Sequence, residues 1–384
     1  MYFETQFWEK LLEMNPNLEE ELYEKNYWKN VSIITLYSLI FVISLLGNSL
    51  VIYIIFSKRR MRTVTNFYIA NLTFADLLMT LINIPFSTAR IILDNWPFGD
   101  LMCQFVPFIQ VCSVYASTLT MCVISLDRHQ AIIYPFGRRL SHVLPLKFVI
   151  PMIWILSSLL SLPHGYFNEV VTYYTYRSLI RCRLMFPEPQ YVYRQWLTIL
   201  TFVSQYVIPL SIATFSYCKI ALHIHRRVIV GNSTPQQIAN NLRQESILMS
   251  NRKTIKMLIL VLVVFAVCWL PLNLYHLLAD FMPDSYQHNF IILIGFHWFS
   301  MSSVCYNPFI YSARNSYFRE SIRNFFRFVF CRCDRITESA NNANTSPNTQ
   351  YMSFRHSSRL IRRESSNTPN GDENKGSFQM RSLV

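Results

Sequence analysis

Asp76 is the residue that points most clearly to chemistry, because it is the only Asp, Glu, Lys or Arg inside seven long apolar stretches of the chain. A carboxylate at membrane depth is costly unless it faces polar partners, so it indicates a functional site by default. Polar side chains at similar depth are Asn48, Ser117, Ser303 and Asn307. We expect them to form one buried, oxygen-rich site with Asp76. The alternative is a neutral Asp that only satisfies hydrogen bonds within the bundle.

The apolar stretches are the elements that position these residues. The chain has 384 residues, of which 52% are hydrophobic and 15% charged, whereas a soluble protein has roughly 25% charged residues. About 20 apolar residues cross a bilayer as a helix, and every stretch is long enough. We therefore predict an all-α membrane protein built as a seven-transmembrane helix bundle. The stretches are 31–57, 63–89, 101–126, 148–168, 195–218, 257–279 and 285–313.

The distribution of positive charge predicts the orientation in the membrane. The net charge of +13 is concentrated in the loops after the first, third and fifth stretches, which share one side. Cytoplasmic loops are enriched in Lys and Arg, so the charge indicates a membrane surface rather than nucleic acid. The amino terminus is then extracellular and the carboxyl terminus cytoplasmic, as in a multi-pass plasma-membrane protein. Residues 1–30 agree, since they contain seven Glu and three Lys and lack a signal-peptide pattern.

A short segment after the bundle has the pattern of a helix that lies on the membrane. Phe318, Ile322 and Phe325 share one helical face, while arginines recur every four residues beside it. Cys331 and Cys333 follow and are candidates for palmitoylation; the alternative is two free cytosolic thiols. Four regions result: an acidic extracellular tail (1–30), the seven-helix bundle (31–313), a short amphipathic eighth helix with its cysteines (314–333) and a disordered cytoplasmic tail (334–384).

Three short motifs are weak signals when each is taken alone. Asp127-Arg128-His129 puts an acid beside an Arg at the inner end of the third stretch, although snorkelling alone explains an Arg there. Asn307-Pro308 and Trp269-Leu270-Pro271 place a proline inside a predicted helix, which predicts a kink. Proline is nevertheless common in membrane helices.

The order of such motifs across all seven stretches resembles the rhodopsin-like family of G-protein-coupled receptors. The resemblance extends over about residues 31–333, and each predicted helix contributes to it. His129 departs from the commoner Tyr, which leaves the pairing of Asp127 with Arg128 intact. The matching positions are Asn48, Asp76, Cys103, Asp127, Arg128, Trp154, Pro209, Tyr217, Phe265, Cys268, Trp269, Pro271, Asn307, Pro308 and Tyr311.

Within that family the chain is similar to neuropeptide Y receptors and their neuropeptide F and RYamide relatives. The runs 127–135 and 296–298 carry this likeness. It implies an extracellular peptide ligand that ends in Arg and an amidated aromatic residue and enters the bundle from outside. His276 stands where relatives often have Asn. The implied ligand-binding residues are Gln110, Gln205, His276, Asp280 and His297.

The side chains of this set suit such a ligand on chemical grounds. Asp280 ends the sixth stretch on the outer side, where a carboxylate could bind a guanidinium in a bidentate pair. Gln110 and Gln205 each offer a donor and an acceptor to an amide. The alternatives are a solvated loop charge for Asp280 and a satisfied interior histidine for His297.

The resemblance also implies a mechanism without catalysis. The ligand shifts the population toward an active bundle, the kink at Trp269 and Pro271 acts as a hinge, and Arg128 becomes free to meet a heterotrimeric G protein, with the inhibitory class favoured. No cofactor is expected other than an allosteric sodium ion at Asp76, Ser117, Ser303 and Asn307. The residues assigned to activation and coupling are Asp127, Arg128, Tyr217, Trp269, Pro271, Asn307, Pro308 and Tyr311.

Two cysteines and two sequons concern the outer side. Cys103 and Cys182 both face the oxidising compartment, and a disulfide between them would clamp the fourth-to-fifth loop over the bundle. Asn30 is a candidate for glycosylation, although it lies close to the membrane. The sequon at Asn71 falls inside a predicted helix, so we expect it to be buried and unused.

The carboxyl-terminal tail contains candidate regulatory sites. Phosphorylation of serines near arginines would create an acidic cluster of the kind arrestins bind in this family. The last three residues, Ser382, Leu383 and Val384, have the form that adds as a strand to a PDZ domain. The amphipathic segment has membrane lipid as its partner. The phosphorylation candidates are Ser357, Ser358, Ser365 and Ser366.

Four alternatives to this interpretation differ in what they require. A proton-coupled transporter would need intramembrane charges beyond Asp76. An intramembrane hydrolase would need a His-Glu-x-x-His motif or paired carboxylates, which the sequence lacks. An amine receptor would place an Asp at Gln110 to pair with the cationic ligand. A receptor of the same fold for a different peptide or a lipid, acting through another G protein, stays open.

Overall fold

The computed structural model describes residues 18–93, 95–134, 145–174, 178–229, 235–282, 290–314, 317–325 and 327. The chain divides into two compact units, Met1–Phe326 and Arg327–Val384. The first contains all the helices and strands named below, and in the second only Arg327 is described.

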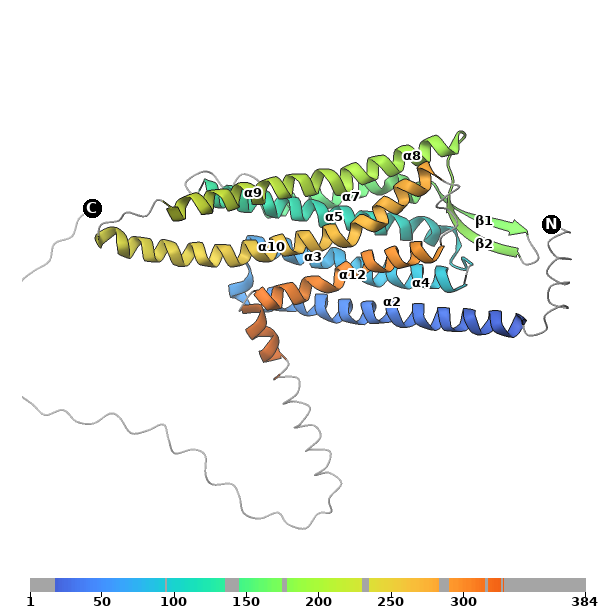
Figure 1. The fold of residues 1–384 in the computed structure, drawn as a ribbon, viewed down its shortest axis with the longest axis horizontal. Coiled ribbons are helices and arrows are strands. Elements are labelled where there is room, and N and C mark those ends of the chain that lie inside the picture. Colours follow the sequence, from blue (N-terminus) through green and yellow to red (C-terminus); the bar gives the residue numbers. More distant parts are fainter. Residues whose placement is uncertain are drawn as a thin grey trace, which may run out of the picture. The chain divides into compact units, whose positions relative to one another are not determined.

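The described part of the first unit consists mainly of seven long helical rods that lie alongside one another (Figure 1). A short turn of 3-10 helix, η1 (Arg59–Met61), follows the first rod. The rods are α2 (Leu18–Ser57), the continuous α3 (Val64–Leu78), η2 (Met79–Asn83) and α4 (Ile84–Leu93), α5 (Gly99–Ile133), α7 (Leu146–Tyr166), the continuous α8 (Gln190–Thr201), η3 (Phe202–Val207) and α9 (Ile208–Ile229), α10 (Pro235–Phe281), and α12 (Phe290–Arg314).

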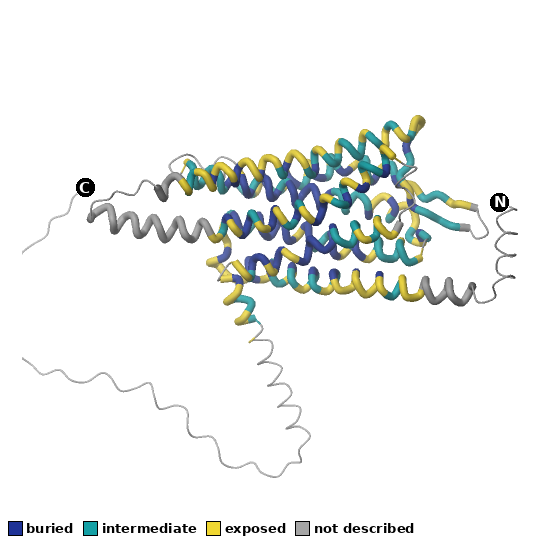
Figure 2. Tube along the Cα trace, in the orientation of Figure 1, coloured by how far each residue is buried: buried dark blue, intermediate teal, exposed yellow. Residues whose placement is uncertain are grey.

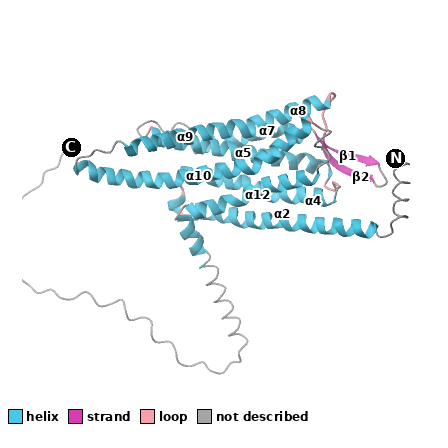
Figure 3. Ribbon diagram, viewed as in Figure 1, coloured by secondary structure: helices cyan, strands magenta, loops and turns pink. Residues whose placement is uncertain are grey.

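Packing between the rods follows a closed order around a central helix. α5 packs against α3, α7 and α9, while α12 packs against both α10 and α2. The two strands form an antiparallel hairpin at one end of the bundle, β1 (Asn168–Tyr174) and β2 (Ser178–Leu184), shown as arrows in Figure 3. The predicted all-α bundle is therefore confirmed, with a small hairpin added at its end.

Polar side chains lie inside this bundle and large apolar ones lie outside, which is the reverse of a soluble protein. Ser44, Asn48 and Ser113 are fully buried, whereas Ile155 and Phe215 expose more than half of their surface. Figure 2 shows buried residues along the centre and exposed ones on the outer surfaces of the rods. An apolar outer surface of this kind is stable against lipid chains, because its exposed side chains need no hydrogen bonds to water.

Length and hydropathy mark six of the described helices as able to cross a membrane. The seventh rod, α12, has 25 residues, which is long enough to span a bilayer. It contains buried Ser300, Ser303 and Asn307, and these polar residues lower its hydropathy. The six helices are Tyr27–Ser57, Val64–Leu93, Gly99–Ile133, Leu146–Tyr166, Gln190–His225 and Lys253–Phe281.

Several helices are longer than the apolar stretches that predicted them. α2 begins at Leu18, before the stretch that starts at residue 31, and α10 begins at Pro235 rather than near residue 257. Hydropathy detects only the part of a helix in lipid, whereas backbone hydrogen bonding continues into polar sequence. The predicted stretch 148–168, by contrast, runs past the end of its helix. Its last residue, Asn168, is the first residue of β1.

Residues 317–325, after α12, are helical, and an amphipathic eighth helix on the membrane surface stays a prediction. Phe318 is fully buried and its ring lies 5.9 Å from that of Tyr311. Arg319 and Arg323 are exposed. Cys331 and Cys333 lie outside the described residues, so their palmitoylation stays a prediction.

Candidate functional site

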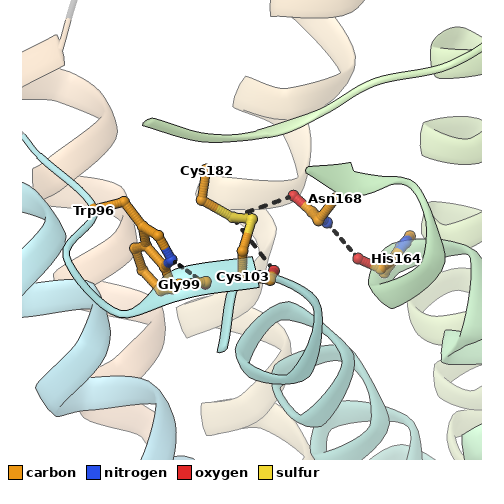
Figure 4. The surroundings of a disulfide bond; sticks show 6 residues. All are labelled: Trp96, Gly99, Cys103, His164, Asn168 and Cys182. Atoms are coloured by element: carbon orange, nitrogen blue, oxygen red, sulfur yellow. Dashed lines mark hydrogen bonds between the residues drawn. A yellow bond between two sulfur atoms is a disulfide. The ribbon is translucent and has the colours of Figure 1, made fainter. Parts of the chain in front are cut away.

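A disulfide fixes the hairpin at the end of the bundle. Cys103, near the start of α5, bonds to Cys182 in β2 with 5.5 Å between the Cα atoms, so the predicted pair is present. Figure 4 shows Trp96 and Asn168 on either side of this bond. Trp96 donates its backbone N–H to the Ile180 carbonyl at 2.7 Å. Together these contacts hold β2 against the start of α5.

The two glutamines expected to bind ligand belong to adjacent rods. Gln205 lies in the π-helix η3, where a wider turn changes the direction of the side chains. Its Nε2 donates to the Val111 carbonyl at 3.1 Å, directly after Gln110 in α5. Gln110 is half-buried and Gln205 is buried. Gln205 is thus bonded to the backbone of α5 beside Gln110.

Asp280, near the end of α10, is engaged by α8 rather than solvated. Its Oδ1 lies 2.6 Å from Arg194 Nε, and Thr198 donates its hydroxyl to Oδ2 at 2.5 Å. Gln195 Nε2 donates to the Asp280 backbone carbonyl at 3.0 Å. The Asp280 side chain is 6% exposed and that of Arg194 is 51% exposed. The solvated loop charge considered from sequence is therefore wrong.

The two histidines of the predicted ligand site differ in their surroundings. His297, in α12, is half-buried and its Nδ1 is 2.7 Å from the Tyr37 hydroxyl of α2. Its ring is therefore positioned by a hydrogen bond between helices. His276 is exposed and lies one helical turn before Asp280 in α10.

Asp76 is buried at the centre of a polar network. Asn307 Nδ2 donates to Asp76 Oδ2 at 2.8 Å, and the Thr80 hydroxyl donates to the Asp76 backbone carbonyl at 2.7 Å. Ser44 Oγ lies 2.6 Å from Thr80 Oγ1 and accepts a bond from Asn48 Nδ2 at 2.9 Å. This network joins α2, α3, η2 and α12. Asp76, Asn48 and Asn307 were expected there from the sequence, whereas Ser44 and Thr80 were not.

A cavity of about 20 Å³ lies beside Asp76, lined also by Ser117, Ser303 and Asn307. Space for one water-sized particle takes about 10–15 Å³, so the cavity can hold a water or a small ion. A carboxylate with hydroxyl and amide oxygens is a suitable donor set for a hard cation. These residues therefore fit a sodium ion, whose charge would be balanced there by Asp76.

Trp269 forms the boundary between this cavity and the outer half of α10. Its Nε1 donates to Ser303 Oγ at 3.1 Å, and its ring stacks on Phe265 with 5.8 Å between centroids. Pro271 follows inside the helix, where it removes one backbone hydrogen bond. Asn273 Nδ2 donates to the Trp269 carbonyl at 2.9 Å. Of the two predicted hinge residues, Trp269 thus bonds to Ser303, which lines the same cavity as Asp76.

Pro308 marks a close approach of α12 to α2. A Cβ placed on Gly47 would lie 2.9 Å from Pro308 Cγ, closer than ordinary van der Waals contact. Only glycine fits at this position without a shift. The proline motif of α12 therefore packs directly against the glycine that precedes Asn48.

At the other end of the bundle, Arg128 pairs with its neighbour Asp127. Arg128 Nη2 and Nε lie 2.5 and 3.2 Å from Asp127 Oδ2. Tyr217 and Tyr311 are buried and line one small cavity of about 10 Å³. The residues assigned to coupling from sequence thus form two nearby features, an ion pair in α5 and a tyrosine pair between α9 and α12.

Residues 47–311 match the model of the family described as "7 transmembrane receptor (rhodopsin family)". The chain belongs to this rhodopsin family of receptors. Its members are multi-pass membrane receptors, so the prediction that the chain is not an enzyme is confirmed by the family. The resemblance drawn from the motifs is confirmed as well.

Curated relatives of this receptor include two kinds of named protein. It is 33% identical to the human Substance-P receptor over 82% of this chain and 77% of the relative. It is 34% identical to the Drosophila melanogaster RYamide receptor over 79% of this chain and 64% of the relative. The Tribolium castaneum RYamide receptor is 31% identical over 80% and 84%, respectively. The likeness to RYamide receptors was expected from the motifs, whereas that to Substance-P receptors was not.

Sequence reasoning missed three residues of the receptor's outer half. Arg194 and Thr198 bind Asp280, and Tyr37 binds His297. A partial signal existed, because Arg194 and Thr198 are four residues apart and share a helical face. Nothing in the sequence indicated which other helix that face would meet.

The two sequons considered above, at Asn30 and Asn71, lie in helices. Asn71 is buried, donates to Thr120 Oγ1 at 2.8 Å and accepts from Trp154 Nε1 at 2.9 Å, so its expected burial is confirmed. Asn30 lies within α2, where the Ser32 hydroxyl donates to the Trp28 carbonyl at 2.8 Å. Glycosylation of Asn30 stays a prediction. The tail candidates Ser357, Ser358, Ser365, Ser366, Ser382, Leu383 and Val384 lie outside the described residues.

Proposed function

We propose that this receptor binds an extracellular neuropeptide that ends in Arg followed by an amidated Tyr or Phe. The observation that carries the proposal is the carboxylate of Asp280 near the end of α10, in the same half of the bundle as Gln205 and His297. A guanidinium matches a carboxylate in a bidentate pair, and the glutamines match an amide. The names of the RYamide receptor relatives support this ligand class.

The proposed response is a shift of population between two arrangements of the bundle. A peptide that contacts α10 and α12 in the outer half would favour one arrangement around Trp269 and Pro271. Trp269 is bonded to Ser303, which lines the cavity with Asp76, so movement there would reach the polar network. Arg128 would then leave Asp127 and meet a heterotrimeric G protein, for which we favour the inhibitory class.

A sodium ion at Asp76 is the second part of this proposal. The donor set and the cavity described above fit such an ion, which would stabilise the inactive arrangement by balancing the buried carboxylate. Asp76, Ser117, Ser303 and Asn307 would hold it. Arrestin, a PDZ-domain protein and membrane lipid are further proposed partners of the carboxyl-terminal segments.

A second candidate ligand is favoured by the human relative, whose name refers to substance P. The test is a peptide panel on cells that express the chain, with cyclic AMP and calcium both measured. The panel contains amidated peptides ending in Arg-Tyr and Arg-Phe, their non-amidated forms and substance P. A response to the amidated Arg peptides alone supports the first candidate, and a response to substance P alone supports the second.

A further inference from the structure

The carboxylate proposed to bind the ligand's guanidinium already binds a guanidinium of the same chain. Arg194 Nε is 2.6 Å from Asp280 Oδ1, and Thr198 occupies Oδ2 at 2.5 Å. Arg194 and Thr198 are four residues apart in α8, so both reach Asp280 from one helical face. Because Asp280 is only 6% exposed, a ligand group cannot pair with both of its oxygens while Arg194 stays in place.

The two partners of Asp280 differ in how easily they can leave. Thr198 has a short side chain fixed to the helix, and Gln195 bonds to the backbone of Asp280 rather than to its carboxylate. Arg194 is a long side chain that is 51% exposed, and its guanidinium is readily hydrated. Ion pairs with an exposed partner contribute little to stability. Arg194 is therefore the partner that a ligand can replace.

We propose that Arg194 is a specificity-determining residue, an internal competitor that holds Asp280 until the guanidinium of the ligand displaces it. This inference rests on the proposed function, because it assumes a ligand that carries Arg. Displacement exchanges one guanidinium for another, so a ligand must match the planar geometry of Arg194. An ammonium group is a point charge and replaces it less well. Arg194 thus raises the concentration required of any ligand whose cation must reach Asp280.

A different role for the same contact would be a permanent brace. α8 packs against α10, and Arg194 could serve only to hold the two helices in the shape that binds ligand. The two roles predict opposite effects of removing the Arg194 charge. Loss of a competitor improves the response to an Arg peptide, whereas loss of a brace weakens the response to any peptide.

The test compares Arg194→Gln with Arg183→Gln, which removes one exposed positive charge from β2 without touching Asp280. Each receptor is assayed for calcium and cyclic AMP with an amidated Arg-Tyr peptide and with the same peptide carrying citrulline or Lys in place of Arg. Citrulline keeps the shape of Arg but has no charge. Arg194→Met, which keeps much of the side-chain volume, is assayed beside Arg194→Gln in case the amide disturbs folding.

We expect Arg194→Gln and Arg194→Met to lower the EC50 for the Arg peptide by about three- to tenfold, as expected for an exposed or partly buried ion pair. The EC50 for the citrulline peptide stays within about twofold, because an uncharged side chain does not displace Arg194, and the EC50 for the Lys peptide falls by about the same factor as that for the Arg peptide. Arg183→Gln changes none of these values by more than about twofold. The proposal is overturned if the Arg194 variants have a higher EC50 for both the Arg and the citrulline peptides. It is also overturned if the EC50 for the citrulline peptide falls as much as that for the Arg peptide.

A second measurement does not depend on knowing the peptide. L-argininamide is added to purified receptor, and the melting temperature is recorded for wild type, Arg194→Gln and the double variant Arg194→Gln/Asp280→Asn. The proposal predicts the largest upward shift for Arg194→Gln and none for the double variant. Equal shifts in all three proteins contradict it. If wild type responds to neither amidated peptide, the proposed function fails, and the argininamide shifts still decide whether Arg194 blocks Asp280.

Discussion

The carboxylates of Asp76 and Asp280 are paired in contrasting ways. Asp76 bonds to Asn307 and lies beside a small cavity lined by hydroxyl and amide groups. Asp280 has both oxygens occupied, one of them by the exposed guanidinium of Arg194. The central site therefore has space for a small ion, whereas the outer site opens only when a side chain moves. A carboxylate in the right position is therefore not by itself an open binding site.

The largest expected effect comes from reversing the outer charge. Asp280→Arg places two guanidinium groups together and removes the carboxylate, so we expect no response to an amidated Arg peptide at any usable concentration. Asp280→Asn, which keeps the size of the side chain, should raise the EC50 roughly a hundredfold, because removing one partner of a buried charge pair costs several kcal/mol. Calcium and cyclic AMP assays measure both, with cell-surface amounts matched by flow cytometry. Unchanged potency would remove Asp280 from the ligand site.

The central carboxylate offers a contrasting test with salt instead of peptide. In wild-type membranes, replacing choline chloride by sodium chloride at equal ionic strength should lower agonist affinity by roughly fivefold, a typical coupling between two sites. Asp76→Ala should abolish this difference, because the cavity loses its charged ligand. Radiolabelled-agonist binding in the two salts measures it, with Arg183→Gln as a variant that should keep the sodium effect. A sodium effect that survives Asp76→Ala contradicts the central site.

The seam between α2 and α12 extends the comparison to packing. Near the centre, Gly47 leaves no room for a Cβ beside Pro308. Gly47→Ala should therefore destabilise the receptor by about 1–3 kcal/mol through overpacking and lower its melting temperature by several degrees. Gly295→Ala is the matched control, because a Cβ there meets nothing within 4 Å. Equal melting temperatures for the two variants would show that the seam is not tight.

Toward the outer half the same seam depends on a hydrogen bond, so a smaller effect is expected. Tyr37→Phe leaves His297 Nδ1 without its 2.7 Å partner and should cost about 1 kcal/mol. A modest fall in the melting temperature of purified receptor measures this. Tyr166→Phe removes a hydroxyl from a side chain that is 75% exposed and should have no effect. If the melting temperature falls in both variants, the loss of a tyrosine hydroxyl lowers stability at either position, and the contact with His297 is not the cause.

The sequence predicted the central site well because its constraints are local. Asp76 and Asn307 are polar residues in apolar stretches, and membrane helices must bring such residues together. Cys103 and Cys182 were predictable in the same way, since they lie on the oxidising side. Burial and compartment leave few possible partners in these cases.

The outer site was only half predictable because its partners come from the geometry of separate rods. Arg194 appeared in the sequence as one more surface charge, and only the packing of α8 against α10 places it on Asp280. The π-helix η3 likewise sets the position of Gln205, and no residue pattern announced it.

The most direct test of the fold is whether the chain crosses the membrane an odd or an even number of times. Hydropathy marks six of the described helices as membrane-spanning, and the receptor fold requires α12 as a seventh. Different epitope tags on the two termini are probed by antibodies on intact cells and then on permeabilised cells. Seven crossings predict that the amino-terminal tag is reached on intact cells and the carboxyl-terminal tag only after permeabilisation. Both tags on the same side would mean an even number of crossings and would contradict the account.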